Sequence, residues 1–235
     1  MEKQNRSYPP NLFGISGRIG SGKDTVGEII QKLCATNEGP NFEIKKFAGK
    51  LKQTASLLTG IDTESFEDQE FKKLNMGEEW DYFNSTLLEG IGKVDHHHKM
   101  TYREFLQKLG TDAMRDGLHI NVWVNALFAD YKCIGGKMIP VSKEDKYNPK
   151  YREYPSWIIT DLRFPNEMEA IVKRGGITIR VTRPVEKSKN IARLHPSETS
   201  LDKADFDYTI NNDGTIEELV QKVRTILITE NIIKK

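Results

Sequence analysis

Nine consecutive residues near the start of the chain have the types and spacing of a loop that binds a polyphosphate. They read Gly17, Arg18, Ile19, Gly20, Ser21, Gly22, Lys23, Asp24 and Thr25. Glycines let the backbone adopt positive φ angles and approach an anion closely. Consecutive N–H groups and the positive end of a following helix would face the phosphates, and Lys23 would bring a full positive charge to them.

The sequence on either side of this loop supplies the strand and the helix that such a loop requires. An apolar run at residues 11–16 predicts a strand, and apolar residues at helical spacing predict a helix to about Ala35. This context argues against a glycine-rich turn that arose by chance. One detail departs from the common pattern, because Asp24 follows the lysine and the hydroxyl comes at Thr25. The departure weakens an assignment of Thr25 as a direct Mg²⁺ ligand. In this respect the loop is similar to that of small-molecule and nucleotide kinases, which also have a residue without a hydroxyl after the lysine.

Three charged residues follow later predicted strands. Residues 156–161 form an apolar run that ends in a carboxylate, as in a strand buried on both faces of a parallel sheet. Ligands on such sheets bind beyond the carboxyl ends of the strands, so we expect Asp161, Arg163 and Arg183 on the same edge as the loop. Asp161 would hold Mg²⁺, directly or through water, or accept a proton from the acceptor. The planar fork of Arg163 suits phosphate oxygens. The structural alternatives are a helix-capping aspartate and a surface arginine.

A basic, irregular segment that begins at Arg183 predicts a cover over the site. Phosphoryl transfer needs positive charge around the phosphates and the exclusion of water, and a cover that carries arginines would supply both. We expect this lid at about residues 183–205, with Arg183 and Arg193 contacting the nucleotide. The alternative is a solvated basic loop.

The middle of the chain predicts an insertion at about residues 61–133. Its first part is polar and contains His96–His98; consecutive histidines cannot all face one metal, so we expect a solvated loop there. Thr101 and Glu104 form a capping box that starts a helix. A second helix is expected to present a buried stripe from Ile120 to Tyr131. Residues 134–155 contain several turn-forming residues and predict an irregular excursion.

Composition limits the classes of protein to which the chain can belong. It has 235 residues and a net charge of +1, with 35 basic and 34 acidic residues, so it lacks the basic footprint of a nucleic-acid binder. No apolar run approaches the length of a membrane span. Two cysteines rule out a disulfide framework and suit a reducing cytoplasm.

The order of predicted elements favours an α/β fold. Five predicted strands, at residues 11–16, 42–48, 156–161, 177–181 and 208–210, alternate with helical patterns. Together with the loop Gly17–Thr25, this order predicts a three-layer P-loop NTPase fold with a parallel five-stranded sheet. The core would comprise residues 11–60 and 156–235, and the chain would form a single domain with an insertion and a lid.

Several longer motifs resemble bacteriophage deoxynucleoside monophosphate kinases. The similarity spans most of the chain, and the motifs after the loop are more specific than the loop itself. They are Phe66–Lys73, Gln107–Asp116, Trp123–Leu127, Ile159–Glu167, His195–Glu198, Phe206–Tyr208 and Asn212–Thr215.

This resemblance implies transfer of the γ-phosphoryl group of ATP, with Mg²⁺, to a deoxynucleoside monophosphate. It also implies strand order 2-3-1-4-5, an insertion that binds the nucleoside monophosphate, and a lid; it favours a homodimer. It carries the ATP site to Gly17–Thr25 and the lid to Arg183–Glu198. Acceptor binding is carried to Lys50, Arg115, Asp116 and Arg163.

Other functions remain open from the sequence. Another small-molecule P-loop kinase, such as a dephospho-CoA kinase, shares the loop, but the motif after the third strand favours the first family. A GTPase-like switch would need Asn-Lys-x-Asp after a late strand, and the sequence has none. A nucleotide-binding protein without turnover is disfavoured by the intact Lys23 and Asp161.

Overall fold

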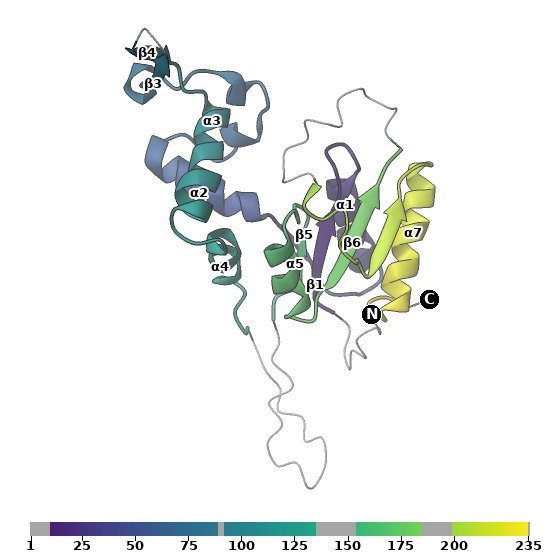
Figure 1. The fold of residues 1–235 in the computed structure, drawn as a ribbon. Coiled ribbons are helices and arrows are strands. Elements are labelled where there is room, and N and C mark those ends of the chain that lie inside the picture. The colour runs from purple at the N-terminus through teal and green to yellow at the C-terminus, as the bar shows by residue number, and fades with distance from the viewer. Residues whose placement is uncertain (1–9, 89–91, 135–153, 185–198, 235) are drawn as a thin grey trace. The chain divides into compact units, whose positions relative to one another are not determined.

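A computed structural model describes residues 10–88, 92–134, 154–184 and 199–234 (Figure 1). The chain divides into two compact units. Unit 1 comprises residues 1–47 and 124–235, and unit 2 comprises Ala48–Trp123. The expected excursion at residues 134–155 and the central part of the expected lid, with Arg193, lie largely outside the described residues.

Unit 1 is built on one parallel five-stranded sheet. Its strands are β1 (Leu12–Ser16), β2 (Glu43–Lys45), β5 (Trp157–Ile159), β6 (Ile177–Thr182) and β7 (Tyr208–Asn211). They lie in the order β2-β5-β1-β6-β7, and every neighbouring pair is parallel. Counted along the chain within this sheet, the order is 2-3-1-4-5, so the expected fold class and strand order are confirmed.

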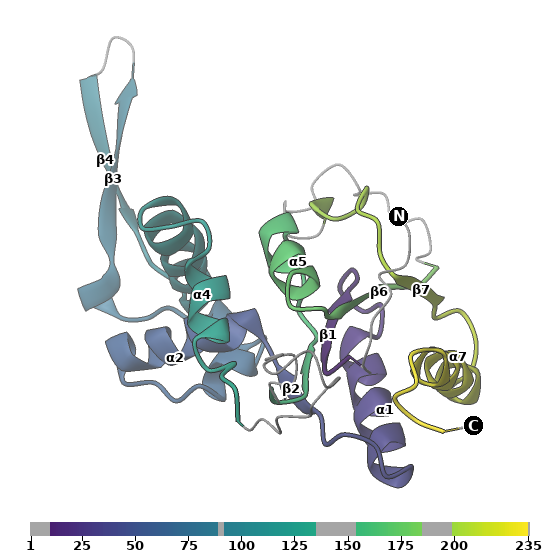
Figure 2. The same cartoon turned by 90° about the horizontal axis from the view of Figure 1, so that it is seen from below.

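Helices cover both faces of this sheet. α1 (Lys23–Thr36) and α7 (Ile216–Thr229) lie on one face, and α5 (Pro165–Val172) lies on the other (Figure 2). Successive side chains of a strand point to opposite faces, so Phe13 and Ile15 pack with α1 and α7, while Leu12 packs with α5. Both faces are buried, which explains why β1 and β5 read as continuous apolar runs.

The helices of unit 1 begin where the sequence provides caps. Thr215 and Glu218 form a capping box at the start of α7, with each side chain bonded to the other residue's backbone N–H. Pro165 occupies the first turn of α5. Ile216 is 51% exposed, so the buried face of α7 is made by Leu219, Val223 and their neighbours.

Unit 2 contains most of the inserted helices and a hairpin. α2 (Phe47–Thr59) enters it, and α4 (Val122–Phe128) leaves it. Between them lie three 3₁₀ turns, η1 (Ser65–Glu67), η2 (Phe71–Lys73) and η3 (Glu78–Trp80), and then β3 (Tyr82–Leu88), β4 (Gly92–His98), α3 (Tyr102–Gln107) and the π-helix η4 (Lys108–Asp116).

A small aromatic core holds unit 2 together. Phe66 is fully buried and packs edge-on against Phe71, whose ring stacks on Tyr102 at 4.4 Å between centroids. Ala55, Met76 and Phe105 complete the buried cluster. The motif Phe66–Lys73 therefore supplies core residues of this unit as well as charged side chains.

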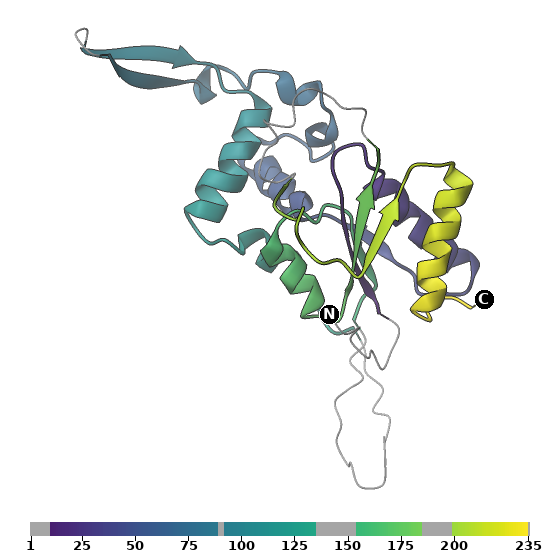
Figure 3. The ribbon, with the colours of Figure 1, turned by 45° about the vertical axis from the view of Figure 1, so that its right-hand side comes forward.

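Three local expectations were wrong. His96–His98 do not lie in a loop but on β4, paired antiparallel with β3 in a hairpin that projects from the helices of unit 2 (Figure 3). Ile120 is 52% exposed because α4 begins two residues later, at Val122. The strand expected over residues 42–48 is limited to Glu43–Lys45, because Phe47 already begins α2.

Candidate nucleotide-binding site

The loop Gly17–Thr25 joins the carboxyl end of β1 to the amino end of α1, as the sequence predicts. Gly20 and Gly22 have φ angles of 75° and 97°, which a side chain would strain. The loop is closed by the Ser21 N–H, which donates to the Arg18 carbonyl at 3.1 Å. Gly22 caps α1 with its carbonyl, which accepts the Val26 N–H at 2.9 Å. The chain therefore presents the first N–H groups of α1 at the positive end of a 14-residue helix.

Lys23 lies across this loop. Its Nζ donates to the carbonyl of Arg18, 3.1 Å away. The ammonium group is thus held against a loop carbonyl, and a phosphate oxygen would replace this contact with a stronger one between opposite charges. This placement fits a nucleoside triphosphate.

Two features of the loop fit a site that holds an anion closely. A Cβ on Gly17 would lie 2.4 Å from Ser21 Oγ and 2.5 Å from the Val181 carbonyl oxygen. Within the described part of the chain, Ser21 Oγ is the buried side-chain polar atom without a hydrogen-bond partner. Buried hydroxyls of this kind commonly mark the place of a ligand or an ordered water. The tight turn and its unsatisfied hydroxyl both fit a site built for an anion and its solvent.

Asp24, the residue that departs from the common pattern, is held by two partners. Its Oδ1 accepts hydrogen bonds from Thr160 Oγ1 at 2.7 Å and from Lys46 Nζ at 3.0 Å. Partial burial acts to raise the pKa of Asp24, but the Thr160 hydrogen bond and the Lys46 ammonium outweigh it and hold this pKa below the ordinary value. Asp24 is therefore ionised at neutral pH. It links the first turn of α1 to the residues that follow β5 and β2.

Asp161 has a structural contact that bears on its expected role. Its side chain is buried, and its Oδ1 accepts the backbone N–H of Phe47 at 2.8 Å, at the start of α2. The structural alternative is therefore partly realised, although the capped helix is α2 and not the helix that follows β5. A role in metal binding stays a prediction.

The chain that follows β5 is fixed beside the loop. The Leu162 N–H donates to the Ile15 carbonyl at 3.2 Å, which brings the segment after β5 next to the end of β1. The buried Glu167 accepts the backbone N–H groups of Arg163 and Phe164 at 2.8 and 3.0 Å. These contacts set the position of Arg163 at this edge of the sheet, where it is half-buried.

Asp202 joins two arginines on the β6 side of the loop. Asp202 accepts hydrogen bonds from Arg18 Nη2 at 3.0 Å and from Arg180 Nη2 at 2.5 Å. Arg180 also donates to Ser16 Oγ at 2.9 Å. Arg183 follows β6 at the same edge and is exposed. Arg193 lies outside the described residues.

Three of the four residues expected to bind the acceptor belong to unit 2, and the fourth, Arg163, belongs to unit 1. Lys50 is a half-buried residue of α2, and Arg115 and Asp116 end the π-helix η4. Trp123 fixes this helix, because its buried indole N–H donates to the Gly110 carbonyl at 2.9 Å. π-helices are rare and often lie at functional sites. Acceptor binding by these residues stays a prediction.

Sequence reasoning missed several partners in this site. Lys46, Thr160, Arg180, Asp202 and Asn212 all contact the loop or residues next to it. Lys46 and Thr160 directly follow strands, so their place at the carboxyl edge was a usable signal. Asp202 and Arg180 carried no such signal, because their roles depend on one another.

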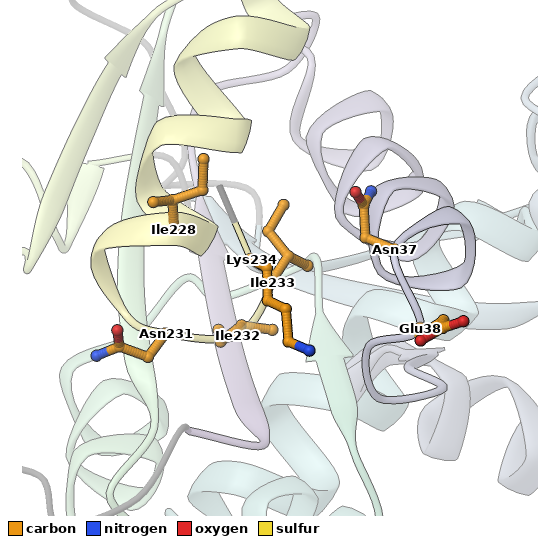
Figure 4. Close-up of a pocket in the computed structure, with 7 residues that line it drawn as sticks. All are labelled: Asn37, Glu38, Ile228, Asn231, Ile232, Ile233 and Lys234. Carbon is orange, nitrogen blue, oxygen red and sulfur yellow. The ribbon is translucent and has the colours of Figure 1, made fainter.

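The pocket shown in Figure 4 lies at the opposite edge of the sheet. It has a volume of about 480 Å³ and is lined by residues of the α1 and α7 ends, among them Asn37, Ile228 and Ile232. α1 runs from the loop to this pocket over 14 residues, which corresponds to about 20 Å of helix. The pocket is therefore separate from the loop.

Two kinds of feature are absent from the described residues. None of the helices there is long and apolar enough to cross a membrane. The same residues contain no group of three or more His, Cys, Asp or Glu side chains arranged to hold a metal ion.

Comparison with known proteins identifies the family. The chain matches the family model described as deoxynucleotide monophosphate kinase over residues 51–223. A deoxynucleotide monophosphate kinase of Enterobacteria phage T4 is 34% identical over 236 residues, which cover 94% of this chain and 89% of that protein. A deoxynucleoside-5'-monophosphate kinase of Escherichia phage T5 is 24% identical, with 81% of this chain and 84% of that protein covered.

A solved dephospho-CoA kinase from Campylobacter jejuni is 16% identical, with a TM-score of 0.40 over 94% of this chain and 97% of that one, a likeness too low to support an inference. The matched region of the family model includes most of unit 2 and the strands β5, β6 and β7 of the sheet in unit 1. The chain belongs to the deoxynucleotide monophosphate kinase family.

Proposed function

We propose that this protein transfers the γ-phosphoryl group of ATP to a deoxynucleoside monophosphate and releases ADP and the diphosphate. The single observation that carries this proposal is the family match over residues 51–223, because it rests on residues other than the loop Gly17–Thr25 that many nucleotide-binding proteins share. The geometry of the loop supports ATP as the phosphoryl donor, because the Lys23 ammonium lies against the loop and α1 begins at the same residue.

The residues of unit 1 would act mainly by positioning and by neutralising charge. Lys23 would exchange its bond to the Arg18 carbonyl for a phosphate oxygen. Arg163 and Arg183, at the carboxyl edge of the sheet, would bring positive charge to the transferring group. Thr25 and Asp161 supply oxygen atoms of the kind that Mg²⁺ prefers, and Asp161 would act directly or through water. Bound Mg²⁺ would neutralise charge on the β and γ phosphates.

The acceptor half of the reaction would lie with unit 2. Lys50 and Arg115 would contact the phosphate of the monophosphate, because basic side chains bind phosphate oxygens. Asp116 would contact the nucleoside, because its carboxylate accepts hydrogen bonds and would repel a phosphate.

A coupled ADP-release assay tests the proposal. The wild-type protein is incubated with MgATP and one acceptor at a time: each deoxynucleoside monophosphate, the corresponding ribonucleotides, and dephospho-CoA. We expect ADP release to be stimulated by one or more deoxynucleoside monophosphates and not by dephospho-CoA. The Lys23→Ala variant, purified in the same way, measures the contribution of contaminating kinases. Absence of stimulation by every deoxynucleoside monophosphate would contradict the proposal.

A further inference from the structure

The turn after β7 reaches the phosphate loop through one side chain. Asn212 Nδ2 donates to the carbonyl of Ser21 at 2.9 Å, across 191 residues of sequence. The backbone of Asn212 is itself anchored, because its N–H donates to the Thr182 carbonyl at 2.7 Å at the end of β6. Lys222 of α7 donates to the carbonyl of Asn211 and to Asp213, which holds the turn from its other side. Asn212 is therefore a fixed donor and not a mobile surface amide.

This hydrogen bond determines the direction of a peptide group in the loop. The peptide that joins Ser21 to Gly22 is planar and trans, so its C=O and N–H point in opposite directions. Because Asn212 holds the Ser21 carbonyl on its own side, the N–H of Gly22 points away from Asn212. Gly22 caps α1, so this N–H lies with the first N–H groups of the helix, which have no carbonyl partners within it.

The loop would not hold this peptide direction by itself. Glycine at position 22 allows many combinations of φ and ψ, and Gly20 adds freedom on the other side of Ser21. A rotated peptide would turn the Ser21 carbonyl, the negative end of its dipole, toward the phosphates. The packing here is also close, since a Cβ on Gly22 would lie 2.5 Å from Asn212 Nδ2. Glycine at position 22 therefore allows both the positive φ angle and the close approach of Asn212.

We propose that Asn212 is a positioning residue of the triphosphate site. It holds the Ser21 carbonyl outside the loop so that the Gly22 N–H is directed at the phosphates. The inference rests on the proposed function only in taking a nucleoside triphosphate as the ligand of Gly17–Thr25. It requires no particular acceptor.

The test compares two ligands and two positions. Calorimetry measures the Kd of MgATP and of magnesium tripolyphosphate, which has the phosphates without the nucleoside, for wild-type protein, Asn212→Ala and Asn212→Leu. The leucine variant keeps a branched side chain of similar size and removes the donor without adding charge. Asn211→Ala and Asn211→Leu are matched controls, because the Asn211 side chain accepts a hydrogen bond from Thr182 Oγ1 in the same turn.

We expect both Asn212 variants to bind both ligands roughly 10-fold more weakly, because the Gly22 N–H would lose its hydrogen bond to a charged phosphate. The Asn211 variants should bind like the wild type. In steady-state assays, KM for the deoxynucleoside monophosphate should change little, whereas KM for ATP rises. Melting temperatures should stay close to wild type for Asn212→Leu; if Asn212→Ala unfolds, the leucine variant decides.

Two results would overturn the inference. If tripolyphosphate binding is unchanged while ATP binding weakens, Asn212 contacts the nucleoside and does not orient the loop. If neither Kd changes, the Ser21 peptide holds its direction without Asn212. Failure of the proposed function is distinguishable, because wild-type protein would then bind MgATP and tripolyphosphate without phosphorylating any deoxynucleoside monophosphate.

Discussion

The carboxylate of Asp24 accepts the hydroxyl hydrogen of Thr160 at 2.7 Å, and this contact joins the first turn of α1 to the end of β5. Asp24 stands where many phosphate loops have a hydroxyl residue. Here the Asp24 carboxylate holds the first turn of α1 against the residue that follows β5. Lys46 adds a second contact to the same oxygen, at 3.0 Å.

We expect a double-mutant cycle on Asp24 and Thr160 to show coupling. Asp24→Ala and Thr160→Val should each lower kcat/KM for ATP by roughly 3- to 10-fold, as for loss of a hydrogen bond to a charged group. The double variant should lose less than the product of the two single effects, because both remove the same bond. Glu28→Gln, on an exposed position of α1, serves as the control. Strictly multiplicative effects would show that the two residues act independently.

Lys23→Ala should lower turnover by about 100- to 1000-fold, the usual cost of removing one preorganised charge that stabilises a transition state. The fold should survive the loss of this side chain, because Lys23 is half-buried and its Nζ contacts the loop. Steady-state kinetics with saturating MgATP measure this loss, and circular dichroism checks the fold. A turnover within a few-fold of wild type would mean that Lys23 does not contact the transferring phosphates.

Gly17→Ala should damage nucleotide binding through the backbone. The new Cβ would lie 2.5 Å from the Val181 carbonyl, so the loop or β6 must shift. We expect the Kd for MgATP to rise by at least about 10-fold, because the shift misplaces the N–H groups that face the phosphates. Gly49→Ala is the matched control, since its added Cβ meets no atom within 4 Å. Normal MgATP binding by Gly17→Ala would contradict the close packing at this turn.

Two substitutions separate the structural and catalytic roles of Asp161. Asparagine keeps an oxygen that accepts the Phe47 N–H, so Asp161→Asn should retain a near-normal melting temperature and MgATP affinity but lose most of its turnover. Asp161→Ala should also melt earlier, because a buried N–H loses its acceptor at a cost of about 1–3 kcal/mol. Calorimetry and steady-state assays of both variants give the comparison. Normal turnover by Asp161→Asn would restrict this residue to capping α2.

Protonation of Glu104 should weaken unit 2 at acidic pH. Hydrogen bonds from Tyr82 and His98, each 2.6 Å long, join its carboxylate to the hairpin strands. The Tyr82 hydrogen bond is the largest influence and lowers the pKa of Glu104 below its ordinary value of 4.5; burial opposes it, and the His98 hydrogen bond reinforces it. A lowered carboxyl pKa stabilises the fold fully above 4.5, and this contribution is lost as pH falls through the folded value.

Glu104→Gln therefore should melt earlier than wild type at pH 7, by about 2–4 °C if roughly 1 kcal/mol is lost. The difference should narrow as pH falls below 4.5, because the wild-type carboxyl becomes neutral as well. Thermal melts of both proteins across this range measure the effect, with Glu79→Gln as an exposed control in the same unit. A difference that does not depend on pH would mean that the charge of Glu104 is not what stabilises the hairpin.

The hairpin shows where sequence patterns fail. Its strands β3 and β4 pair through seven positions, yet neither strand has an apolar residue at every second place. Alternation appears when one face of a sheet is buried, and a hairpin that projects into solvent does not require it. Pairing here is supported by contacts such as His97 with Asp81 and with the Phe83 ring, which no periodicity reveals.

The sequence by itself determined the parallel sheet, the loop Gly17–Thr25 and the edge at which Asp161 and Arg183 lie. These follow from local patterns, because buried parallel strands require continuous apolar runs and their carboxyl ends meet at one edge. Only the tertiary structure decided the partners of the loop: Asn212 on Ser21, Thr160 on Asp24, and Asp202 on Arg18. Each pair is separated by more than 130 residues, and a hydrogen bond depends on atomic positions that strand register and helix packing set together.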